Sequence, residues 1–330
     1  MLKNLNVYAI FFFFSLPFYA NSYKTSAITY ALNRGRFGDN LITYIKAKWI
    51  SYKYSIPLLI KSFNYSEELT LNRIEKQYTS DLRKNFTRII KFEKKSNVKI
   101  EKEKPYLYIS TYNSNITFDK NDKTFINILK KTIAPQKQYK KHNIPKNRIS
   151  VALHVRKGGG FDLPLLSSIN KKNKKTKYAD KCWPLKFPPD EYYIDQIKKI
   201  CNILNNAPLH IHIFTDDPNP LQILEKYKKS VEHLNITFSC RMEGNKHDKS
   251  VLEDFFSMTQ YDCLIRSASN FSACADIIGN FLISIYPKNS HWENNKLIID
   301  EVQIQTNLNN HNKDSKFFKN NFLMQEILTT

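Results

Sequence analysis

The feature that most constrains the fold is a stretch in the middle of the chain, residues 151–160, with the sequence VALHVRKGGG. Its apolar run up to His154 predicts a buried strand, and the three glycines predict a loop. Only 7 of the 330 residues are glycine, so three in succession indicate a specific backbone requirement. There, backbone N–H groups, Arg156 and Lys157 can converge on a small anion. A flexible β-turn beside two surface cations explains the same residues, and both interpretations remain open at this point.

Predicted strands and helices alternate along the rest of the chain, which is typical of an α/β fold with mainly parallel strands. Further strands are expected at residues 26–32, 55–60, 106–110, 209–214, 235–238, 262–266 and 297–299. Helices are expected at residues 41–50, 125–133, 190–204, 221–231, 252–260 and 273–278, and residues 67–95 are expected to be helix and loop.

A polar, proline-containing segment at residues 134–147 indicates a boundary between two domains. We therefore expect one α/β domain at residues 23–140 and a second at residues 141–305. The remaining residues, 306–330, are expected to form a polar C-terminal tail.

Residues 1–22 have the pattern of a secretory signal peptide: Lys3, a short run rich in phenylalanine, and small residues near Ala20. An uncleaved signal anchor is the alternative, although Pro17 and the short apolar run do not favour a spanning helix. We expect export, which means the periplasm or membrane in a bacterium and the lumen of the endoplasmic reticulum or Golgi in a eukaryote.

The chain is strongly basic, with 51 Lys and Arg against 30 Asp and Glu and a net charge of +21. This balance favours anionic partners such as a phosphorylated small molecule, and it leaves a peripheral contact with an anionic membrane open. Signatures of nucleic-acid-binding families are absent from the sequence, which argues against nucleic acid. The cysteines are odd in number and form no C-x-x-C pair, so no metal site is predicted. Export permits disulfides, but the sequence does not give their connectivity, and each cysteine could instead be a buried free thiol. The cysteines are Cys182, Cys201, Cys240, Cys263 and Cys274.

Three further places can hold an anion or a ligand. The loop at residues 33–40 contains Gly35, Arg36 and Asp39 and leads into a predicted helix. A second loop, at residues 267–272, also precedes a helix, and Ser272 could simply be its N-cap.

The third is the pair Asp216 and Asp217, which follows a predicted strand. Ligands of open α/β sheets bind at such strand ends. For one of these two aspartates, capping of the next helix is the expected role.

Four motifs of this chain, taken together with their order along the sequence, resemble those of the fucosyltransferase superfamily. This superfamily comprises alpha-1,2-, alpha-1,6- and protein O-fucosyltransferases. Residues 154–159 (HVRKGG) resemble its H-x-R-R-G-D motif, and residues 213–217 (IFTDD) its strand ending in Thr-Asp. Residues 253–272 resemble its acidic helix, cysteine, short strand and Ser-x-Phe-Ser turn, and residues 34–40 (RGRFGDN) its G-R-x-G-N-Q loop.

The resemblance implies a GT-B architecture of two facing Rossmann-like domains, with residues 23–140 on the acceptor side and residues 141–305 binding the nucleotide sugar. It also implies an inverting, metal-independent transfer of fucose from GDP-fucose to a glycan or protein hydroxyl, with no cofactor beyond that donor. Another donor sugar is one alternative, and a nucleotide- or glycan-binding protein without turnover is another. The implied donor-binding residues are His154, Arg156, Lys157, Gly158, Asp216, Asp217, Ser269, Phe271, Ser272, Gly35 and Arg36.

For catalysis the resemblance points to Arg156, which would neutralise the departing diphosphate. Gly159 stands where the motif has an aspartate, so the general base is open. Asp162, three residues further on, and Asp39 are the two candidates.

Overall fold

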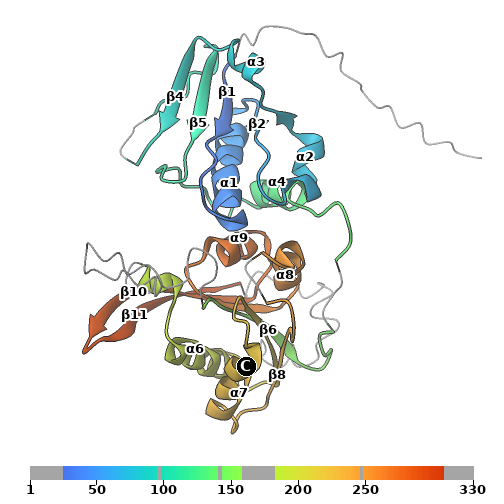
Figure 1. Cartoon of the computed structure of the whole chain (residues 1–330), viewed down its shortest axis with the longest axis vertical. Helices are drawn as coiled ribbons and strands as arrows, with labels where there is room; N and C mark the ends of the chain where they lie inside the picture. Colours follow the sequence, from blue (N-terminus) through green and yellow to red (C-terminus); the bar gives the residue numbers. More distant parts are fainter. Residues whose placement is uncertain (1–24, 95–97, 140–142, 158–182, 246–247, 308–330) are drawn as a thin grey trace, which may run out of the picture.

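The computed structural model describes residues 25–94, 98–139, 143–157, 183–245 and 248–307. Within them, the main sheets are one of three strands from the first half of the chain and one of six strands from the second half (Figure 1). The first half contains β1 (Ala27–Tyr30), α1 (Phe37–Tyr54), β2 (Leu59–Ile60), η1 (Ser66–Glu68), α2 (Leu71–Ile74), β3 (Lys76–Gln77), α3 (Ser80–Arg83), β4 (Arg88–Phe92), β5 (Tyr106–Ser110) and α4 (Lys123–Thr132). The second half contains β6 (Ile149–Val155), η3 (Pro184–Lys186), α6 (Asp190–Ile203), β7 (Leu209–Thr215), α7 (Pro220–Ser230), β8 (Ile236–Cys240), α8 (Val251–Met258), β9 (Cys263–Arg266), α9 (Asn270–Ile278), β10 (Ile283–Glu293) and β11 (Lys296–Thr306).

The first sheet is parallel, in the order β1-β5-β4. Helix α1 covers β1 and β5 and buries its apolar side against them. Tyr30 and Tyr44 are among the largest fully buried side chains here, and their rings meet edge to face. The Tyr30 hydroxyl donates to the Lys61 carbonyl, so the buried phenol keeps a hydrogen-bond partner.

The second sheet has the order β11-β10-β9-β6-β7-β8 and is parallel except for β11. Helices α6 and α7 lie on one side of it and α8 and α9 on the other (Figure 1). Every residue of β6 and β7 is buried, as expected of central parallel strands covered on both faces. After β6 the chain adds β7 and β8 on one side, then returns to add β9 and β10 on the other. The carboxyl ends of β6 and β9 therefore flank the point where strand order reverses, which is where such sheets bind ligands.

One hydrophobic core joins the two halves. Helices α8 and α9, from the second half, pack against α1 of the first half, between the two sheets (Figure 1). The rings of Phe37 on α1 and Phe255 on α8 lie 5.2 Å apart, edge to face. The two halves are thus held together by buried apolar surface as well as by polar contacts.

The structure corrects several element boundaries. Helix α1 begins at Phe37 rather than at residue 41, so Gly38 and Asp39 belong to its first turn. Helix α9 begins at Asn270 rather than at residue 273, so the second half of the expected turn, residues 270–272, is helical. Strand β4 lies inside the region expected to be helix and loop, and β10 was not expected at all. The expected short strand at residues 297–299 is part of the longer β11.

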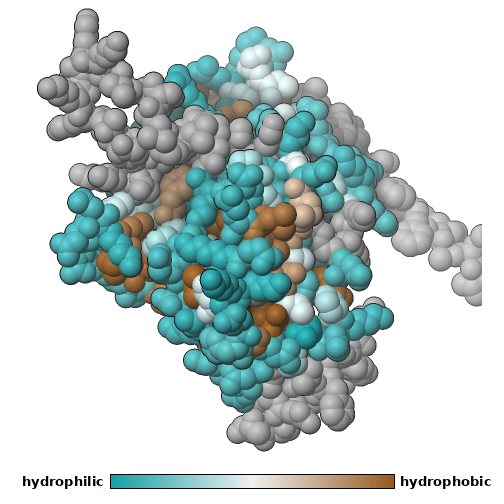
Figure 2. Space-filling model, turned by 60° about the horizontal axis from the view of Figure 1, so that its bottom comes forward, coloured by the Kyte–Doolittle hydropathy of each residue, from teal (hydrophilic) through white to brown (hydrophobic). Residues whose placement is uncertain are grey.

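The predicted domain boundary falls in the segment between α4 and β6, and the domain limits themselves stay a prediction. The predicted signal segment and most of the tail lie outside the described residues. No helix in the described part of the chain combines the length and the apolar character needed to cross a membrane. The face that Figure 2 shows is predominantly hydrophilic, with hydrophobic residues in separate patches. The described cysteines are free thiols: Cys201, Cys240, Cys263 and Cys274.

Candidate functional site

A cavity of about 940 Å³ lies between the two halves. Residues from both contribute to its wall, which makes it a site between two α/β units. The first half contributes residues 33–39, Asn64, Tyr65 and Tyr112. The second half contributes His154, Arg156, residues 183–186, residues 214–216, Asp248, Lys249, Val251, Asp254, residues 268–271 and residues 288–290.

The amino-terminal ends of three helices contribute to this wall. Helices α1, α8 and α9 each place first-turn residues in it. Their N-cap residues, Arg36, Ser250 and Ser269, make no side-chain capping hydrogen bond. The first N–H groups of a helix have no partner within the helix, and the helix dipole places positive charge there. The wall is therefore suited to an anion.

The first turns of α1 and α9 touch. A Cβ on Gly38 would lie 2.4 Å from the backbone nitrogen of Phe271, so only glycine allows this approach. Beside it, the Asn270 side-chain amide donates to Asp39 Oδ1 at 2.7 Å and to the Tyr112 hydroxyl at 2.9 Å. Asn270 thus fixes two cavity residues of the opposite half.

The N-terminal loop is held in shape by its own polar side chains. Asn40 donates to the Gly35 carbonyl at 3.0 Å and accepts from the Asn33 backbone at 3.2 Å. A Cβ on Gly35 would lie 2.2 Å from Asp39 Oδ2, so the Asp39 carboxylate occupies the space that glycine leaves open. Gly35, Arg36 and Asp39 all line the cavity.

Arg156 and Asp216 meet at the carboxyl ends of β6 and β7. The Arg156 side chain is nearly buried, and its Nη1 lies 3.6 Å from Asp216 Oδ2. The Lys157 backbone N–H donates to Asp216 Oδ1 at 2.9 Å. Because 3.6 Å is too long for a hydrogen bond, Asp216 Oδ2 has no hydrogen-bond donor among the described residues. Arg156 and Asp216 therefore bring opposite charges to the same wall.

His154 lies on β6 opposite Arg266 of β9, next to the point where strand order reverses. Burial lowers the pKa of His154 well below its usual range. The negative charge of Asp216 acts to raise this pKa, and the positive charge of Arg266 acts to lower it further. The imidazole is therefore neutral near pH 7. Its buried Nδ1 has no hydrogen-bond partner in the described part of the structure, and its ring lies 5.6 Å from that of Phe271. A ligand that supplies a donor or acceptor there would satisfy it.

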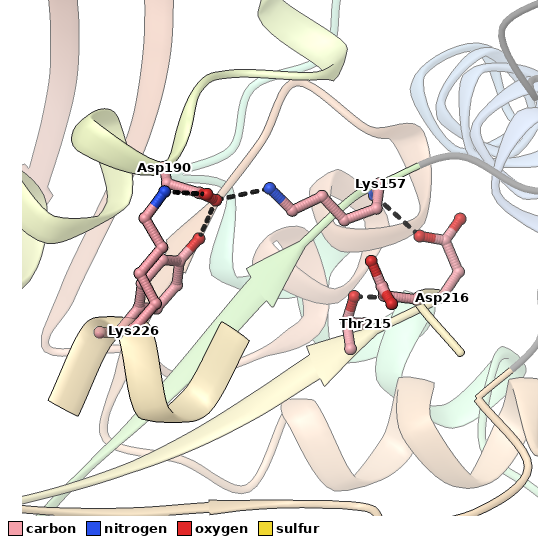
Figure 3. A network of polar contacts seen from close by, with 7 residues as sticks. Lys157, Asp190, Thr215, Asp216 and Lys226 are labelled. Carbon is pink, nitrogen blue, oxygen red and sulfur yellow. Dashed lines mark hydrogen bonds and ion pairs between the residues drawn. The ribbon is translucent and has the colours of Figure 1, made fainter. Parts of the chain in front are cut away.

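The Lys157 side chain was expected to bind the donor, but its ammonium group pairs with an aspartate of the second half. Its ammonium is 2.5 Å from Asp190 Oδ1 at the start of α6, and Figure 3 shows the side chain extended toward Asp190. Asp190 also accepts from Lys226 Nζ at 2.6 Å and from the Tyr227 hydroxyl at 2.7 Å. Although burial alone would raise the pKa of Asp190, these contacts lower it to about 2. Lys157 thus contributes its backbone N–H beside the cavity, while its charge serves a network toward α6 and α7.

The remaining predicted residues divide into two groups. Ser269 and Phe271 line the cavity. Asp217 Oδ1 instead accepts from the Asn219 backbone at 2.7 Å, which forms an Asx-turn. The N-cap of α7 is Asn219, so the expected capping of this helix by an aspartate is wrong. The fully buried Ser272 hydroxyl donates to the Ser269 carbonyl, and the N-cap of α9 is Ser269 rather than Ser272. Gly158 and Asp162 lie outside the described residues.

Asp254, on α8, lines the cavity and was not among the predicted site residues. Burial raises its pKa to about 7, although Arg241 acts in the opposite direction. Arg241 pairs with both Asp254 and Glu253. The only sequence signal was the acidic start of a predicted helix, which is also the normal composition of a first helical turn.

Groups of three or more His, Cys, Asp or Glu side chains arranged to hold a metal ion do not occur among the described residues.

No protein-family model matches the chain, and no curated protein matches its sequence. Among solved structures, a mutant of Arabidopsis thaliana FUT1 in complex with GDP is similar at a TM-score of 0.50 and 10% identity, over 80% of this chain and 71% of that chain. POFUT1 in complex with GDP-fucose has a TM-score of 0.43 and 10% identity, over 79% and 97% of the two chains. NodZ alpha-1,6-fucosyltransferase soaked with GDP-fucose has a TM-score of 0.42 and 10% identity, over 86% and 99%.

The likeness to the plant structure confirms the expected fold, a GT-B-like α/β architecture with mainly parallel sheets. At this level of identity the shared feature is the arrangement of strands and helices.

Proposed function

We propose that this chain is a glycosyltransferase that transfers fucose, or a related sugar, from a GDP-sugar to a hydroxyl group of a glycan or protein. The observation that carries the proposal is the meeting of three uncapped helix ends with Arg156 at one cavity. Helix N-termini and a guanidinium stabilise a diphosphate through N–H groups and positive charge. The shared fold with FUT1, which was solved with GDP, supports guanosine diphosphate as the nucleotide.

The nucleobase is assigned to His154 and Asp254, which both line the cavity. Neutral imidazole offers one donor and one acceptor, and a carboxylate accepts the two N–H groups of a guanine edge. Nδ1 of the buried His154 has no hydrogen-bond partner among the described residues, and a matching base would supply one. The Asp254 carboxylate pairs with Arg241 and stays partly exposed at the cavity, where it can accept from the base as well. This favours a guanine nucleotide over a uracil nucleotide, which lacks that pair of donors.

The proposed reaction is a direct displacement with inversion at the anomeric carbon. The acceptor oxygen forms the new bond to that carbon as the bond to the diphosphate oxygen breaks. The acceptor proton passes to Asp39, which Asn270 holds at 2.7 Å and which faces the cavity. Arg156 and the helix N-termini stabilise the charge that develops on the departing diphosphate, so the chain itself supplies what a metal ion would otherwise provide.

Export to the periplasm or to the secretory lumen is also proposed, on the signal-like residues 1–22. In a eukaryotic lumen, the donor would be available to the enzyme. A peripheral contact with an anionic membrane would use the basic excess of the chain.

A protein of the same fold that binds nucleotide or glycan without turnover is the second candidate. The observation that favours it is the engagement of Lys157 with Asp190, which takes one motif cation away from the donor. Gly159 also stands where the motif has a carboxylate.

Release of GDP from GDP-fucose, measured with and without a panel of oligosaccharide and peptide acceptors, separates the two candidates. The transferase predicts acceptor-dependent GDP release that Asp39→Asn reduces by about 100-fold or more, since a positioned base contributes about that factor. GDP affinity should change little in this variant, because asparagine keeps an oxygen that can accept from Asn270. Binding of GDP without release in any mixture would instead establish the second candidate.

A further inference from the structure

One part of the cavity wall contains none of the residues assigned to the donor. It is formed by the short helix η3 and the bulged part of β10, and we call it the η3–β10 wall. Its residues are Trp183, Lys186, Lys288, Asn289 and Ser290. The two elements lie side by side. The Ala268 N–H donates to the Leu185 carbonyl at 2.9 Å, so η3 is fixed to the loop that precedes α9.

Trp183 is the unusual residue of this wall. Its side chain remains 51% exposed although it borders a cavity, whereas most large aromatic side chains among the described residues are buried or half-buried. The Lys186 ammonium lies 5.4 Å from the centre of the indole ring. On the opposite half, Tyr112 is 41% exposed, lines the same cavity and has its hydroxyl fixed by Asn270. Two exposed aromatic rings therefore border one cavity from different halves.

The polar part of the wall is also ordered. The register of β10 against β11 shifts between Pro287 and Asn289 and again between Asn289 and Ser290. A bulge of this kind re-aims side chains and is common beside binding sites. Lys288 Nζ lies 2.6 Å from Oε1 of Glu301, and the Asn289 amide donates to the other carboxylate oxygen, Oε2, at 2.5 Å. Glu301 therefore holds both side chains in place.

We propose that the η3–β10 wall is a carbohydrate subsite and that the acceptor is a glycan rather than a protein side chain. The identification of this carbohydrate as the acceptor rests on the proposed transferase function. Sugar rings present C–H groups on one face and hydroxyls at the edge. An exposed indole accommodates the apolar face, and amide, hydroxyl and ammonium groups bind the edge. Asp39 lines the same cavity, in the half that also carries Tyr112.

The test uses the full chain on an array of immobilised oligosaccharides, with and without saturating GDP. We expect binding to at least one oligosaccharide, and a loss of about tenfold or more in Trp183→Ala, which corresponds to about 1.4 kcal/mol. Trp183→Phe should retain much of the binding, because it keeps an aromatic face. Trp292→Ala is the matched control, since Trp292 is also an exposed tryptophan, sits on β10 and lies outside the cavity wall.

The outcomes for the subsite and for the proposed function are separate. GDP affinity, measured by calorimetry, should be unchanged in Trp183→Ala and in Trp292→Ala. No glycan binding by a protein that binds GDP would overturn the subsite and leave the transferase in place. Glycan binding that depends on Trp183 in a protein that does not bind GDP would keep the subsite and remove the transferase. Transfer to a peptide hydroxyl that is insensitive to Trp183→Ala would also overturn the glycan proposal.

Discussion

Gly38 of α1 and Phe271 of α9 are in direct contact, and a Cβ on Gly38 would lie 2.4 Å from the Phe271 backbone nitrogen. The Cys274 thiol, one turn further along α9, lies 3.7 Å from the Gly38 carbonyl. This contact brings two helix N-termini from different halves to the same cavity. The position of the anion-binding groups therefore depends on the packing of the two halves.

Replacing Gly38 by alanine should separate the two helix ends, because the added methyl group meets backbone rather than a movable side chain. We expect a loss of stability of about 1–3 kcal/mol, as is typical of overpacking, and weaker GDP binding. Thermal unfolding and calorimetry measure the two effects. Gly244→Ala is the comparison variant, since Gly244 does not line the cavity and its Cβ would meet nothing within 4 Å, so only its positive φ disfavours alanine. Equal GDP affinity in the two variants would contradict the role given to the Gly38 contact.

Arg156→Ala and Lys157→Ala should differ sharply although the residues are neighbours. Removal of the guanidinium should weaken GDP binding by about 100-fold or more, about 2.7 kcal/mol. Lys157→Ala keeps the backbone N–H that binds Asp216, so GDP affinity should fall by no more than about threefold, below 1 kcal/mol. Its main effect should be on stability, because Asp190 loses one of its three donors. A larger loss of affinity in Lys157→Ala than in Arg156→Ala would reverse the assignment.

GDP affinity should depend on pH through Asp254, whose pKa burial raises to about 7. A carboxylate that accepts from the base must be ionised, so the protein releases a proton on binding below pH 7. The affinity of the wild type should therefore rise from pH 6 to pH 8 relative to that of Asp254→Asn. The nucleotide itself also titrates in this range, but this affects both proteins equally and cancels in the ratio of their affinities. A constant ratio of the two affinities would exclude Asp254 as an ionised acceptor.

Asp262 should affect stability rather than binding. Its Oδ2 accepts from the Ser150 backbone, tying β9 to β6, and burial raises its pKa to about 6. A raised carboxyl pKa stabilises the fold at low pH, and that contribution is lost as the pH rises through about 6. Denaturant unfolding should therefore show Asp262→Asn gaining stability relative to the wild type between pH 4 and pH 7. A difference that does not change with pH would contradict the buried protonated carboxyl.

Much of the fold follows from local sequence patterns. Strands β6 and β7 are rich in apolar residues and lead toward a glycine cluster and a pair of aspartates, respectively, and these patterns identify central parallel strands. Strand β4, with the sequence RIIKF, is charged and largely exposed at the edge of its sheet, so no pattern distinguishes it from a loop. Strand β10 contains Pro287 and a polar second half, and it is stabilised by pairing with β11, which sequence periodicity cannot reveal.

The candidate site is predictable where it lies at strand ends. His154, Arg156 and Asp216 follow parallel strands whose carboxyl ends must meet at one edge of the sheet. The direction of Lys157 was missed because consecutive residues leaving a strand point to opposite sides, and only the positions of α6 and α7 show what lies on the second side. Trp183 was missed because it follows a long polar run and enters the cavity only through the position of η3.

The most direct test is calorimetric titration of the full chain with GDP, with UDP as the comparison. Because the cavity combines helix N-termini and Arg156 with a guanine-matching pair, GDP should bind with micromolar or tighter affinity, about −8 kcal/mol. UDP should bind at least about tenfold more weakly, and Arg156→Ala should remove most of the binding of both. Absence of GDP binding by the folded wild type would contradict the account.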